Sequence, residues 1–423
     1  MNVMRIDGGV PLRGTVRAQG AKNAALPVMA TCLLLKGRTL TLDDVPDLYD
    51  VSTMMELLRA LGATVSRDAD EPGRVVFDVP EDVSWEAPEA LVRQMRASSL
   101  VLGPLLARGG RAALPLPGGC SIGSRPIDLH LKGLVQMGAK IEIRNGVVHA
   151  QADRLRGRRI YLDFPSVGAT ENLMMAAALA HGETIIENIA REPEIDDLAS
   201  VLEALGVPIE IEGVGCVRIQ GVEEARSGAG RVIPDRIEAC TYILAGLMTG
   251  GEVTVTNVIP AHIDAMLAKL EEAGARFVVS RDTVSVSPVG KLRPISVKTL
   301  PFPGFPTDLQ PQMVAALCMA NGVSMVEESV FQSRFLYAQE LARMGADIRV
   351  KGDTALIEGP CRLQGANVRA TDLRAGAALI LAGLAAQGRT QVEEMVHVWR
   401  GYEAIDEKLR SLGARVELAE GLA

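Results

Sequence analysis

The sequence repeats one phrase six times, and this repetition constrains the fold more than any other feature. In each phrase an amphipathic helix runs to a glycine, and a short alternating strand follows. The copies read LLRALGATV, GLVQMGAKI, VLEALGVPI, KLEEAGARF, ELARMGADI and KLRSLGARV, with glycines at 62, 138, 206, 274, 345 and 413. Successive glycines are 76, 68, 68, 71 and 68 residues apart. Such a period indicates a fold built from one repeated supersecondary unit.

Each phrase belongs to a longer unit that contains two helices of different character. The glycine after the amphipathic helix is suited to a left-handed C-cap. The second helix lies upstream and is rich in Ala, Leu and Met, as in NLMMAAALAH from residue 172 and AGAALILAGLAAQ from residue 375. Because these helices are apolar almost all round, we expect them to be buried. The unit is therefore predicted to run β-α-β-α-β-β, with helices inside and sheets outside.

Length and repeat number together predict the domain organisation. A chain of 423 residues exceeds the size at which one hydrophobic core keeps growing. We therefore expect an α/β fold of two lobes, each an inside-out α/β barrel of three units. The first domain is predicted over residues 22–233, and the second is predicted to be discontinuous, 1–21 plus 234–423. The N-terminal strand, expected over 2–12, has no complete unit of its own and should pair with the second domain.

Composition argues against several classes of partner. Aromatic residues make up only 3% of the chain, too few for a base-stacking platform. The net charge is −8 and there is no run of Lys and Arg, so neither nucleic acid nor a membrane surface is an expected partner. No apolar run could span a bilayer, and the first residues lack a signal-peptide pattern. We expect a cytoplasmic protein.

Cysteines and histidines give no sign of a disulfide framework or a metal site. The six cysteines are scattered without CxxC spacing, which is typical of reduced thiols. The five histidines form no HxxxH pair.

One cysteine stands out, because Cys120 lies in the Gly- and Pro-rich stretch PLPGGCSIGSRPIDLH from residue 115, near the cation Arg125. Reactive cysteines tend to lie beside cations; a buried, inert thiol in a surface loop is the alternative.

Cations recur at the starts of the predicted buried helices. These residues are Lys22, Arg96, Arg236 and Arg374. Helix capping does not require them, and a cation opposes the positive end of the helix dipole. Together with that dipole, however, they could bind a phosphate or carboxylate. Arg334 and Arg400 lie beside aromatic residues and could be structural stacking arginines or further anion ligands.

Several motifs together resemble one enzyme family. The most specific are GAKNAALPVMA at 20–30, LPGGCSIGSRPIDLHLKGL at 116–134, SVGATENLMMAA at 166–177, AREPEIDDLA at 190–199, PDRIEA at 234–239, PGFPTDLQPQ at 303–312, ATDLRA at 370–375 and RGYEAID at 400–406. They resemble the bacterial UDP-N-acetylglucosamine enolpyruvyl transferases of the EPSP synthase superfamily. The resemblance covers about residues 5–418, and the two-lobed fold of that superfamily agrees with the repeat.

The resemblance implies a reaction and its substrates. The family transfers the enolpyruvyl group of phosphoenolpyruvate to the 3′-hydroxyl of UDP-N-acetylglucosamine and releases phosphate, the first committed step of peptidoglycan synthesis. The chemistry is addition followed by elimination through a tetrahedral ketal, with no metal or redox cofactor. It requires a proton donor to the methylene carbon, a base near the hydroxyl, and cations for the phosphate and carboxylate. The resemblance also suggests a monomer.

The resemblance also assigns roles to residues. Cys120 would be the proton donor, and Asp308 the base or the carboxylate that orients the hydroxyl. Lys22, Arg125 and Arg400 would hold the phosphate, with Arg334 and Arg374 near the carboxylate or in the network of the closed state. Asn23 and Asp372 would position these groups. The residues implied in nucleotide-sugar binding are Arg96, Arg125, Pro126, Ile127, Asp128, Leu129, Pro165, Ser166, Val167, Gly168, Asp308 and Val330.

The sequence departs from the family pattern at four places that could affect acceptor specificity or lobe closure. These are Gln332, Trp399, Cys240 and Tyr49, where we expect Glu, Asp, Gly and, in some members, Lys. Two alternative functions stay open. One is enolpyruvyl transfer to another acceptor, such as shikimate 3-phosphate or a different nucleotide, although the shikimate-pathway enzyme lacks the loop around Cys120. The other is a catalytically silent paralogue that senses UDP-N-acetylglucosamine.

Overall fold

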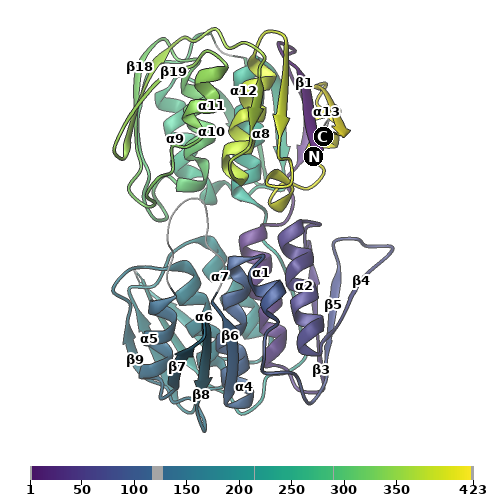
Figure 1. Ribbon diagram of the computed structural model, residues 1–423, viewed down its shortest axis with the longest axis vertical. Helices are drawn as coiled ribbons and strands as arrows, with labels where there is room; N and C mark the ends of the chain where they lie inside the picture. The colour runs from purple at the N-terminus through teal and green to yellow at the C-terminus, as the bar shows by residue number, and fades with distance from the viewer. Residues whose placement is uncertain (1, 117–126, 214, 289, 421–423) are drawn as a thin grey trace. The chain divides into compact units, whose positions relative to one another are not determined.

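A computed structural model describes residues 2–116, 127–213, 215–288 and 290–420. The chain divides into two compact units, one up to Gln19 and from Pro234 onwards, the other between Gly20 and Ile233. We call the first the C-terminal unit and the second the inserted unit. Each has its own hydrophobic core, and the two sets of core residues do not overlap. Each unit is described below by itself (Figure 1).

The inserted unit contains the first three repeats. Its helices are α1 (Lys22–Ala30), α2 (Tyr49–Leu61), α3 (Glu89–Val92), α4 (Leu102–Gly109), α5 (Asp128–Gln136), α6 (Val167–Ala178) and α7 (Pro193–Ala204), with 3-10 turns η1 (Thr31–Leu34) and η2 (Arg96–Val101). Its strands are β3 (Arg38–Asp43), β4 (Thr64–Arg67), β5 (Val75–Val79), β6 (Arg111–Pro115), β7 (Lys140–Arg144), β8 (Val147–Gln151), β9 (Arg159–Tyr161), β10 (Glu183–Glu187), β11 (Ile209–Glu212), β12 (Cys216–Gln220) and β13 (Gly228–Arg231).

The C-terminal unit contains the last three repeats and the start of the chain. Its helices are α8 (Arg236–Thr249), α9 (Asp264–Glu272), α10 (Gln310–Leu317), α11 (Ala338–Arg343), α12 (Leu373–Ala385) and α13 (Ile405–Ser411), with 3-10 turns η3 (Pro260–His262), η4 (Thr307–Leu309) and η5 (Val398–Arg400). Its strands are β1 (Asn2–Asp7), β2 (Arg13–Arg17), β14 (Glu252–Thr256), β15 (Arg276–Val279), β16 (Thr283–Ser287), β17 (Ser296–Lys298), β18 (Gly322–Glu327), β19 (Asp347–Lys351), β20 (Thr354–Gly359), β21 (Asn367–Arg369), β22 (Arg389–Glu393) and β23 (Arg415–Glu420).

The repeated phrase folds as predicted in all six copies. All six glycines have positive φ, between 85° and 117°, which an L-residue with a side chain adopts only with strain. The amphipathic helix ends before each glycine and the strand begins after it. The apolar helices α8, α10 and α12 contact one another, and their side chains are almost entirely buried. Figure 1 shows these three helices side by side within their unit. The prediction of helices inside and sheets outside is confirmed.

The sheets share one strand order. In β9-β10-β12-β11, the first two strands are parallel, and β12 is antiparallel to both of its neighbours. The sheets β13-β3-β5-β4, β2-β14-β16-β15 and β17-β18-β20-β19 repeat this pattern. In the second copy, β6-β8-β7, the first strand is reduced to a bridge between Glu86 and Ala113. The fold class predicted from the repeat is therefore confirmed.

The prediction of one N-terminal strand over 2–12 is wrong. Residues 2–7 form β1, which pairs antiparallel with β22 and β23, whereas β2 pairs parallel with β14 in a different sheet. The break lies at Gly8 and Gly9. A Cβ atom on Gly8 would lie 2.3 Å from the carbonyl oxygens of Gly383 and Ala386, and Gly9 has a φ of +78°. Both strands nevertheless pair with strands of the C-terminal unit, as predicted for an N-terminal segment that has no complete repeat unit of its own.

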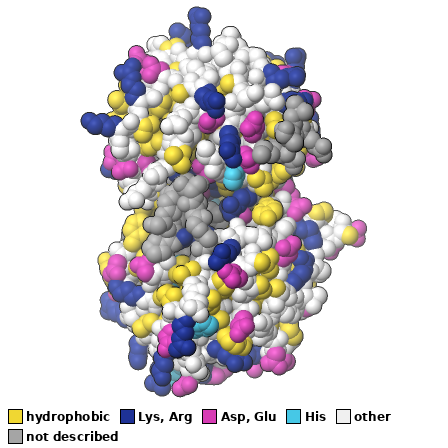
Figure 2. Space-filling model, in the orientation of Figure 1, with side chains coloured by type: hydrophobic (Ala, Val, Ile, Leu, Met, Phe, Trp, Pro, Cys, Tyr) yellow, Lys and Arg dark blue, Asp and Glu magenta, His cyan; other side chains and the backbone are white. Residues whose placement is uncertain are grey.

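Two further findings concern the surface. None of the helices in the described part of the chain is both long and apolar enough to cross a membrane. On the face of each unit seen in Figure 2, basic and acidic side chains are interspersed rather than collected into one large patch of a single sign. This distribution agrees with the sequence, which has no cationic run.

Candidate active site

In the C-terminal unit, Asp308 joins two arginines from distant segments. Asp308 lies in η4, Arg334 between β18 and α11, and Arg374 in the first turn of α12. Oδ1 of Asp308 accepts a hydrogen bond from Nη2 of Arg334 at 3.0 Å, and Oδ2 accepts one from Nη2 of Arg374 at 2.8 Å. The arginine side chains are only 2% and 5% exposed, whereas Asp308 is 27% exposed. The carboxylate is thus accessible while both of its cations are buried.

Each of the two arginines has a buried N–H group that makes no hydrogen bond within the described part of the chain. Nε of Arg334 and Nη1 of Arg374 are buried and have no hydrogen-bond partner among the described residues. Burial lowers the pKa of Arg374, but the charges of Asp308, Tyr402 and Asp235 together with the hydrogen bond to Asp308 outweigh it, so the pKa lies above the ordinary value. The guanidinium of Arg374 therefore stays charged. A buried cation with an unpaired donor is poised to bind an anion.

Aromatic rings support the two guanidinium groups. The Cζ atom of Arg334 lies 5.7 Å from the ring centroid of Phe331, and that of Arg374 lies 6.0 Å from the ring of Tyr402. Cation–π contacts of this kind fix the plane of a guanidinium. The two interpretations offered for Arg334, stacking and anion binding, are therefore compatible. Arg400 ends η5, two residues before Tyr402.

Asp372 and Val330 lie beside this cluster and are held by main-chain geometry. Asp372 is the N-cap of α12, and its Oδ1 accepts hydrogen bonds from the amides of Arg374 and Ala375 at 2.9 and 3.1 Å. Such a cap fixes the start of the helix that carries Arg374. Val330 is half-buried and donates its amide to the Oε1 atom of Glu328 at 2.9 Å.

Sequence reasoning missed Glu328, which organises this part of the unit. Its side chain is buried and accepts hydrogen bonds from the hydroxyls of Thr299 and Thr307 at 2.8 and 2.9 Å, besides the amides of Val330 and Phe331. Thr307 directly precedes Asp308. Glu328 therefore ties η4 to the loop after β18. No local signal identifies it, because a Glu at the end of a strand is unremarkable until its partners from other segments are known.

The predicted residues of the inserted unit gather at helix starts. Lys22 is the first residue of α1, and its Nζ lies 3.2 Å from Oδ2 of the buried Asp50 at the start of α2. Asn23 follows it and is half-buried. Arg96 begins η2 and is half-buried. The cation of Lys22 is thus anchored by a carboxylate that the sequence did not single out.

A second group lies at the starts of α5 and α6. Ser166 is the N-cap of α6, and its Oγ accepts from the amide of Ala169 at 3.4 Å. The half-buried stretch Pro165, Ser166, Val167 and Gly168 leads into this helix. In and next to α5, Asp128 is exposed, Leu129 is half-buried and Ile127 is buried. Cys120, Arg125 and Pro126 lie outside the described residues.

His130 is another residue that the sequence did not identify. It is buried in α5, and its Nδ1 lies 2.9 Å from Nδ2 of Asn172. A Cβ atom on Gly168 would lie 3.3 Å from the ring. Burial, together with the charge of Arg96, lowers the pKa of His130 to about 4. The ring is therefore neutral at pH 7, and its packing against Gly168 supports the start of α6.

Comparison with known proteins identifies the family. Over residues 6–409 the sequence matches the family described as EPSP synthase (3-phosphoshikimate 1-carboxyvinyltransferase). UDP-N-acetylglucosamine 1-carboxyvinyltransferase 2 of Carboxydothermus hydrogenoformans is 55% identical over 414 residues, covering 97% of this chain and 98% of that protein. UDP-N-acetylglucosamine 1-carboxyvinyltransferase 1 of Caldanaerobacter subterraneus is 50% identical over 97% of this chain and 98% of that protein. This chain belongs to the UDP-N-acetylglucosamine 1-carboxyvinyltransferase family.

Solved structures agree with the fold of this transferase. The enolpyruvyl transferase NikO from Streptomyces tendae matches with a TM-score of 0.89 and 28% identity over 99% of this chain and 98% of that one. EPSP synthase from Acinetobacter baumannii matches with a TM-score of 0.77 and 18% identity over 99% of this chain and 100% of that one. The second likeness concerns the fold alone.

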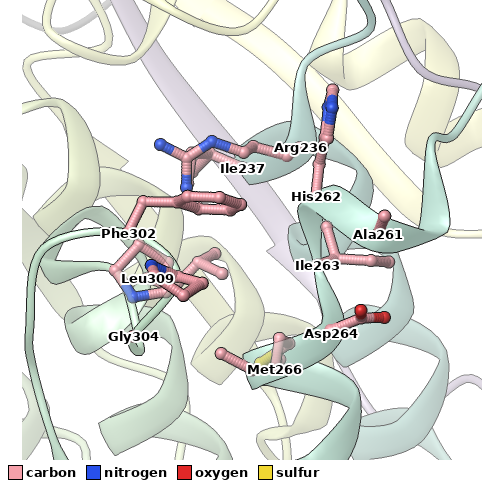
Figure 3. Close-up of a pocket in the computed structure, with 13 residues that line it drawn as sticks. Arg236, Ile237, Ala261, His262, Ile263, Asp264, Met266, Phe302, Gly304 and Leu309 are labelled. Atoms are coloured by element: carbon pink, nitrogen blue, oxygen red, sulfur yellow. The ribbon is translucent and has the colours of Figure 1, made fainter. Parts of the chain in front are cut away.

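The transferase also has a small pocket apart from the Asp308 cluster. Figure 3 shows the guanidinium of Arg236 over the ring of Phe302, with His262 on the other side of the pocket. The Cζ atom of Arg236 lies 5.8 Å from the centroid of Phe302. The cavity measures about 60 Å³, far below the volume that a nucleotide sugar requires. None of the site residues implied by the resemblance lines it.

The four departures from the family pattern have different environments. Tyr49 is 48% exposed and donates its hydroxyl to Oε1 of Gln94 at 3.2 Å. Gln332 is exposed, Trp399 is half-buried against the core, and Cys240 is buried in α8. None of them occupies the Asp308 cluster.

Proposed function

We propose that this enzyme transfers the enolpyruvyl group of phosphoenolpyruvate to the 3′-hydroxyl of UDP-N-acetylglucosamine and releases phosphate. The observation that carries the proposal is the cluster in which the accessible Asp308 bridges two buried arginines with spare donors. The names of the relatives supply the acceptor. Addition of a hydroxyl to phosphoenolpyruvate, an anionic enol phosphate, requires a base placed next to fixed cations.

The spare donors suit the carboxylate of phosphoenolpyruvate. Nε of Arg334 and Nη1 of Arg374 can each donate to a new anion without breaking an existing hydrogen bond. Because both guanidinium groups are buried and fixed by Asp308 and by aromatic rings, they require little reorganisation when the substrate binds.

The same geometry suggests how Asp308 becomes a base. While both of its oxygens accept hydrogen bonds from arginine, the carboxylate is a weak proton acceptor. A substrate carboxylate that binds the spare donors neutralises part of the positive charge beside Asp308 and so makes its carboxylate a better proton acceptor. Asp308 can then accept the proton of the 3′-hydroxyl. Binding of phosphoenolpyruvate would therefore switch on the base that deprotonates the acceptor.

The reaction balances in two stages. In the addition, the 3′-oxygen bonds to C2 of phosphoenolpyruvate, its proton passes to Asp308, and C3 receives a proton from the thiol of Cys120, giving a tetrahedral ketal. In the elimination, C3 gives a proton to the thiolate of Cys120, the C2–O bond breaks with its electrons going to the leaving phosphate, which takes the proton from Asp308, and the double bond is restored. A nearby cation such as Arg125 favours the thiolate form of a cysteine. We expect the dianionic phosphate of phosphoenolpyruvate to offset this charge and keep the thiol of Cys120 protonated.

The remaining roles follow the resemblance. Lys22, Arg125 and Arg400 would bind the phosphate, and Asn23 would position it. Asp372 would hold the start of α12, as its capping hydrogen bonds suggest. Ile127, Asp128, Leu129, the stretch 165–168, Arg96, Pro126 and Val330 would contact the nucleotide sugar. We further propose that the enzyme works in the cytoplasm as a monomer.

One assay tests the proposal against its alternatives. Phosphate release from phosphoenolpyruvate should require UDP-N-acetylglucosamine, and shikimate 3-phosphate or another nucleotide sugar should not replace it. Turnover with one of those acceptors alone would reassign the substrate. Binding of UDP-N-acetylglucosamine without any phosphate release would indicate a sensor instead.

Two treatments probe the assigned groups directly. Cys120→Ser should abolish turnover, and an epoxide phosphonate such as fosfomycin should alkylate the wild-type thiol but not the variant. Asp308→Asn should lower kcat at least about a hundredfold, since it removes the base. The matched control is Glu203→Gln at an exposed position of α7, which should keep full activity. Full turnover by Cys120→Ser would remove its role as proton donor.

A further inference from the structure

Gln19 uses all of its polar groups to hold segments that are distant in sequence. It is 3% exposed and is the last residue before the chain passes into the inserted unit. Its backbone amide donates to Oε2 of Glu238 at 2.6 Å, and its carbonyl accepts from the amide of Asp235 at 2.8 Å. These backbone bonds fix Gln19 to the start of α8 and do not depend on the identity of its side chain.

The side-chain amide of Gln19 clamps the segment that follows Arg400. Nε2 donates to the carbonyl of Gly401 at 3.1 Å, and Oε1 accepts from the amide of Glu403 at 2.8 Å. The orientation of the amide is unambiguous, because a flip would place its NH₂ group against an N–H and its oxygen against a carbonyl. Gln19 therefore bonds the main chain one and three residues after Arg400.

Glu238, which accepts the hydrogen bond from the backbone amide of Gln19, is buried and paired with a cation. Glu238 is 0% exposed, and its Oε1 atom lies 2.8 Å from Nζ of Lys408 in α13. A buried carboxylate needs such a partner. Gln19 is thus attached to a fixed part of the unit rather than to a mobile side chain.

The rest of the segment is fixed from another direction. The hydroxyl of Tyr402 lies 2.9 Å from that of Thr241 and accepts from Nε2 of Gln312 at 3.2 Å. A Cβ atom on Gly401 would lie 2.7 Å from Leu373, so this residue packs directly against α12. These contacts fix Tyr402, and the amide of Gly401 donates to the carbonyl of Val398 at 3.0 Å. The side chain of Gln19 adds the bonds to the carbonyl of Gly401 and the amide of Glu403.

We infer that Gln19 is a positioning residue that sets the main-chain geometry behind Arg400 and so the binding of the phosphate of phosphoenolpyruvate. The inference rests on the proposed function, in which Arg400 binds that phosphate. Gln19 itself does not need to touch the substrate. Its two hydrogen bonds end on the residues that determine the direction in which the chain leaves η5.

The test is Gln19→Leu, which keeps the approximate size of the side chain and both backbone bonds but removes the clamp. We expect kcat/KM for phosphoenolpyruvate to fall about tenfold or more, while KM for UDP-N-acetylglucosamine changes less than about twofold. Gln364→Leu, at an exposed position of the same unit, is the matched control and should match wild type in both. An equal loss for both substrates, or no loss, would overturn the inference.

A double variant separates positioning from general damage. If Gln19 acts through Arg400, Gln19→Leu added to Arg400→Ala should weaken phosphoenolpyruvate binding, measured by calorimetry, no further than Arg400→Ala alone. A further loss in the double variant would contradict the inference.

Gln19→Glu is a second variant should Gln19→Leu fold poorly, because it keeps an acceptor for the amide of Glu403 but faces the carbonyl of Gly401 with an oxygen. It should show the same selectivity for phosphoenolpyruvate.

The failure of the proposed function gives a different result. If wild type releases no phosphate with UDP-N-acetylglucosamine, the proposed function fails. If wild type is active and Arg400→Ala binds phosphoenolpyruvate normally, the role of Arg400 fails, and the inference about Gln19 fails with it. If Arg400→Ala is defective and Gln19→Leu is normal, only the inference about Gln19 is wrong.

Discussion

Asp308 accepts a hydrogen bond from Nη2 of Arg374 at 2.8 Å, although 66 residues separate the two along the chain. The guanidinium is almost completely buried and the carboxylate is partly exposed. Removing the carboxylate of Asp308 therefore leaves the guanidinium of Arg374 buried without its counter-ion. An added anion could then occupy the place of the missing carboxylate. This asymmetry suits the pair both to a structural role and to the anion binding proposed above.

We predict that Asp308→Ala lowers the free energy of unfolding by about 2 kcal/mol, less than for a fully buried pair because Asp308 is partly exposed. Added phosphate should stabilise this variant more than wild type, since an anion can replace the lost carboxylate. Thermal unfolding with and without phosphate measures both effects. Asp153→Ala, at an exposed position, is the control. Equal stabilisation of variant and wild type by phosphate would contradict the idea of a vacated anion site.

Glu171 predicts a pH dependence of stability. It is buried in α6, its Oε1 has no hydrogen-bond partner among the described residues, and burial, with the charges of Glu194 and Glu192, raises its pKa well above 4.5. Between the unfolded and folded pKa values, the folded state binds a proton that the unfolded state has lost. The stability of wild type should therefore fall as the pH rises through this range, by about 1.4 kcal/mol per pH unit from this group.

Replacing Glu171 by Gln removes this contribution. The stability of Glu171→Gln relative to wild type should rise by about 1.4 kcal/mol per pH unit between the ordinary pKa of a glutamate and the raised pKa of the folded state. Urea unfolding at pH 5.5, 6.5 and 7.5 measures the difference. Glu203→Gln, an exposed change of the same kind, should follow the wild-type pH curve. Parallel curves for Glu171→Gln and wild type would show that the folded state binds no extra proton at this position.

Cys361 should be the most reactive of the described thiols. A hydrogen bond from Cys318 is the largest influence, and with the amide of Asp347 it outweighs burial and lowers the pKa of Cys361 to about 6. The pKa of Cys216, the other half-buried cysteine, is raised instead, mainly by burial. At pH 7 iodoacetamide should label Cys361 at least about tenfold faster than Cys216, as peptide mass spectrometry can follow. Cys318→Ala should slow the labelling of Cys361; an unchanged rate would assign its reactivity to another cause.

The repeated glycines can be tested by a pair of alanine substitutions. Gly138 has a φ of +100°, and a Cβ atom there would meet nothing within 4 Å in the described part of the chain, so Gly138→Ala introduces backbone strain. We expect it to lower the free energy of unfolding by about 1 kcal/mol. Gly109, the last residue of α4, is equally open but lies outside the positive-φ region. Gly109→Ala should be neutral or stabilising by up to about 1 kcal/mol. Equal effects of the two changes would contradict the left-handed cap.

The sequence by itself determined the local architecture of this protein. A helix that ends at Gly62 or Gly413, and a helix that begins after Asp235 or Asp372, depend on residues a few positions apart, so their patterns are readable in one dimension. The burial of α12 follows equally from its composition. Resemblance to a family singled out Asp308 and gave a role to Cys120, which its Gly- and Pro-rich stretch near Arg125 had already marked.

Tertiary structure decided what depends on distant segments. The N-terminal residues form two strands in two sheets because Gly8 packs so closely against the carbonyl oxygens of Gly383 and Ala386 that a Cβ atom there would lie 2.3 Å from them, and no local pattern contains these neighbours. Glu328 and Gln19 look ordinary in the sequence. Their importance arises from hydrogen bonds to residues brought together by folding. Local backbone preferences are encoded within a few residues, whereas a hydrogen-bond partner hundreds of positions away exists only once the sheets and helices have packed.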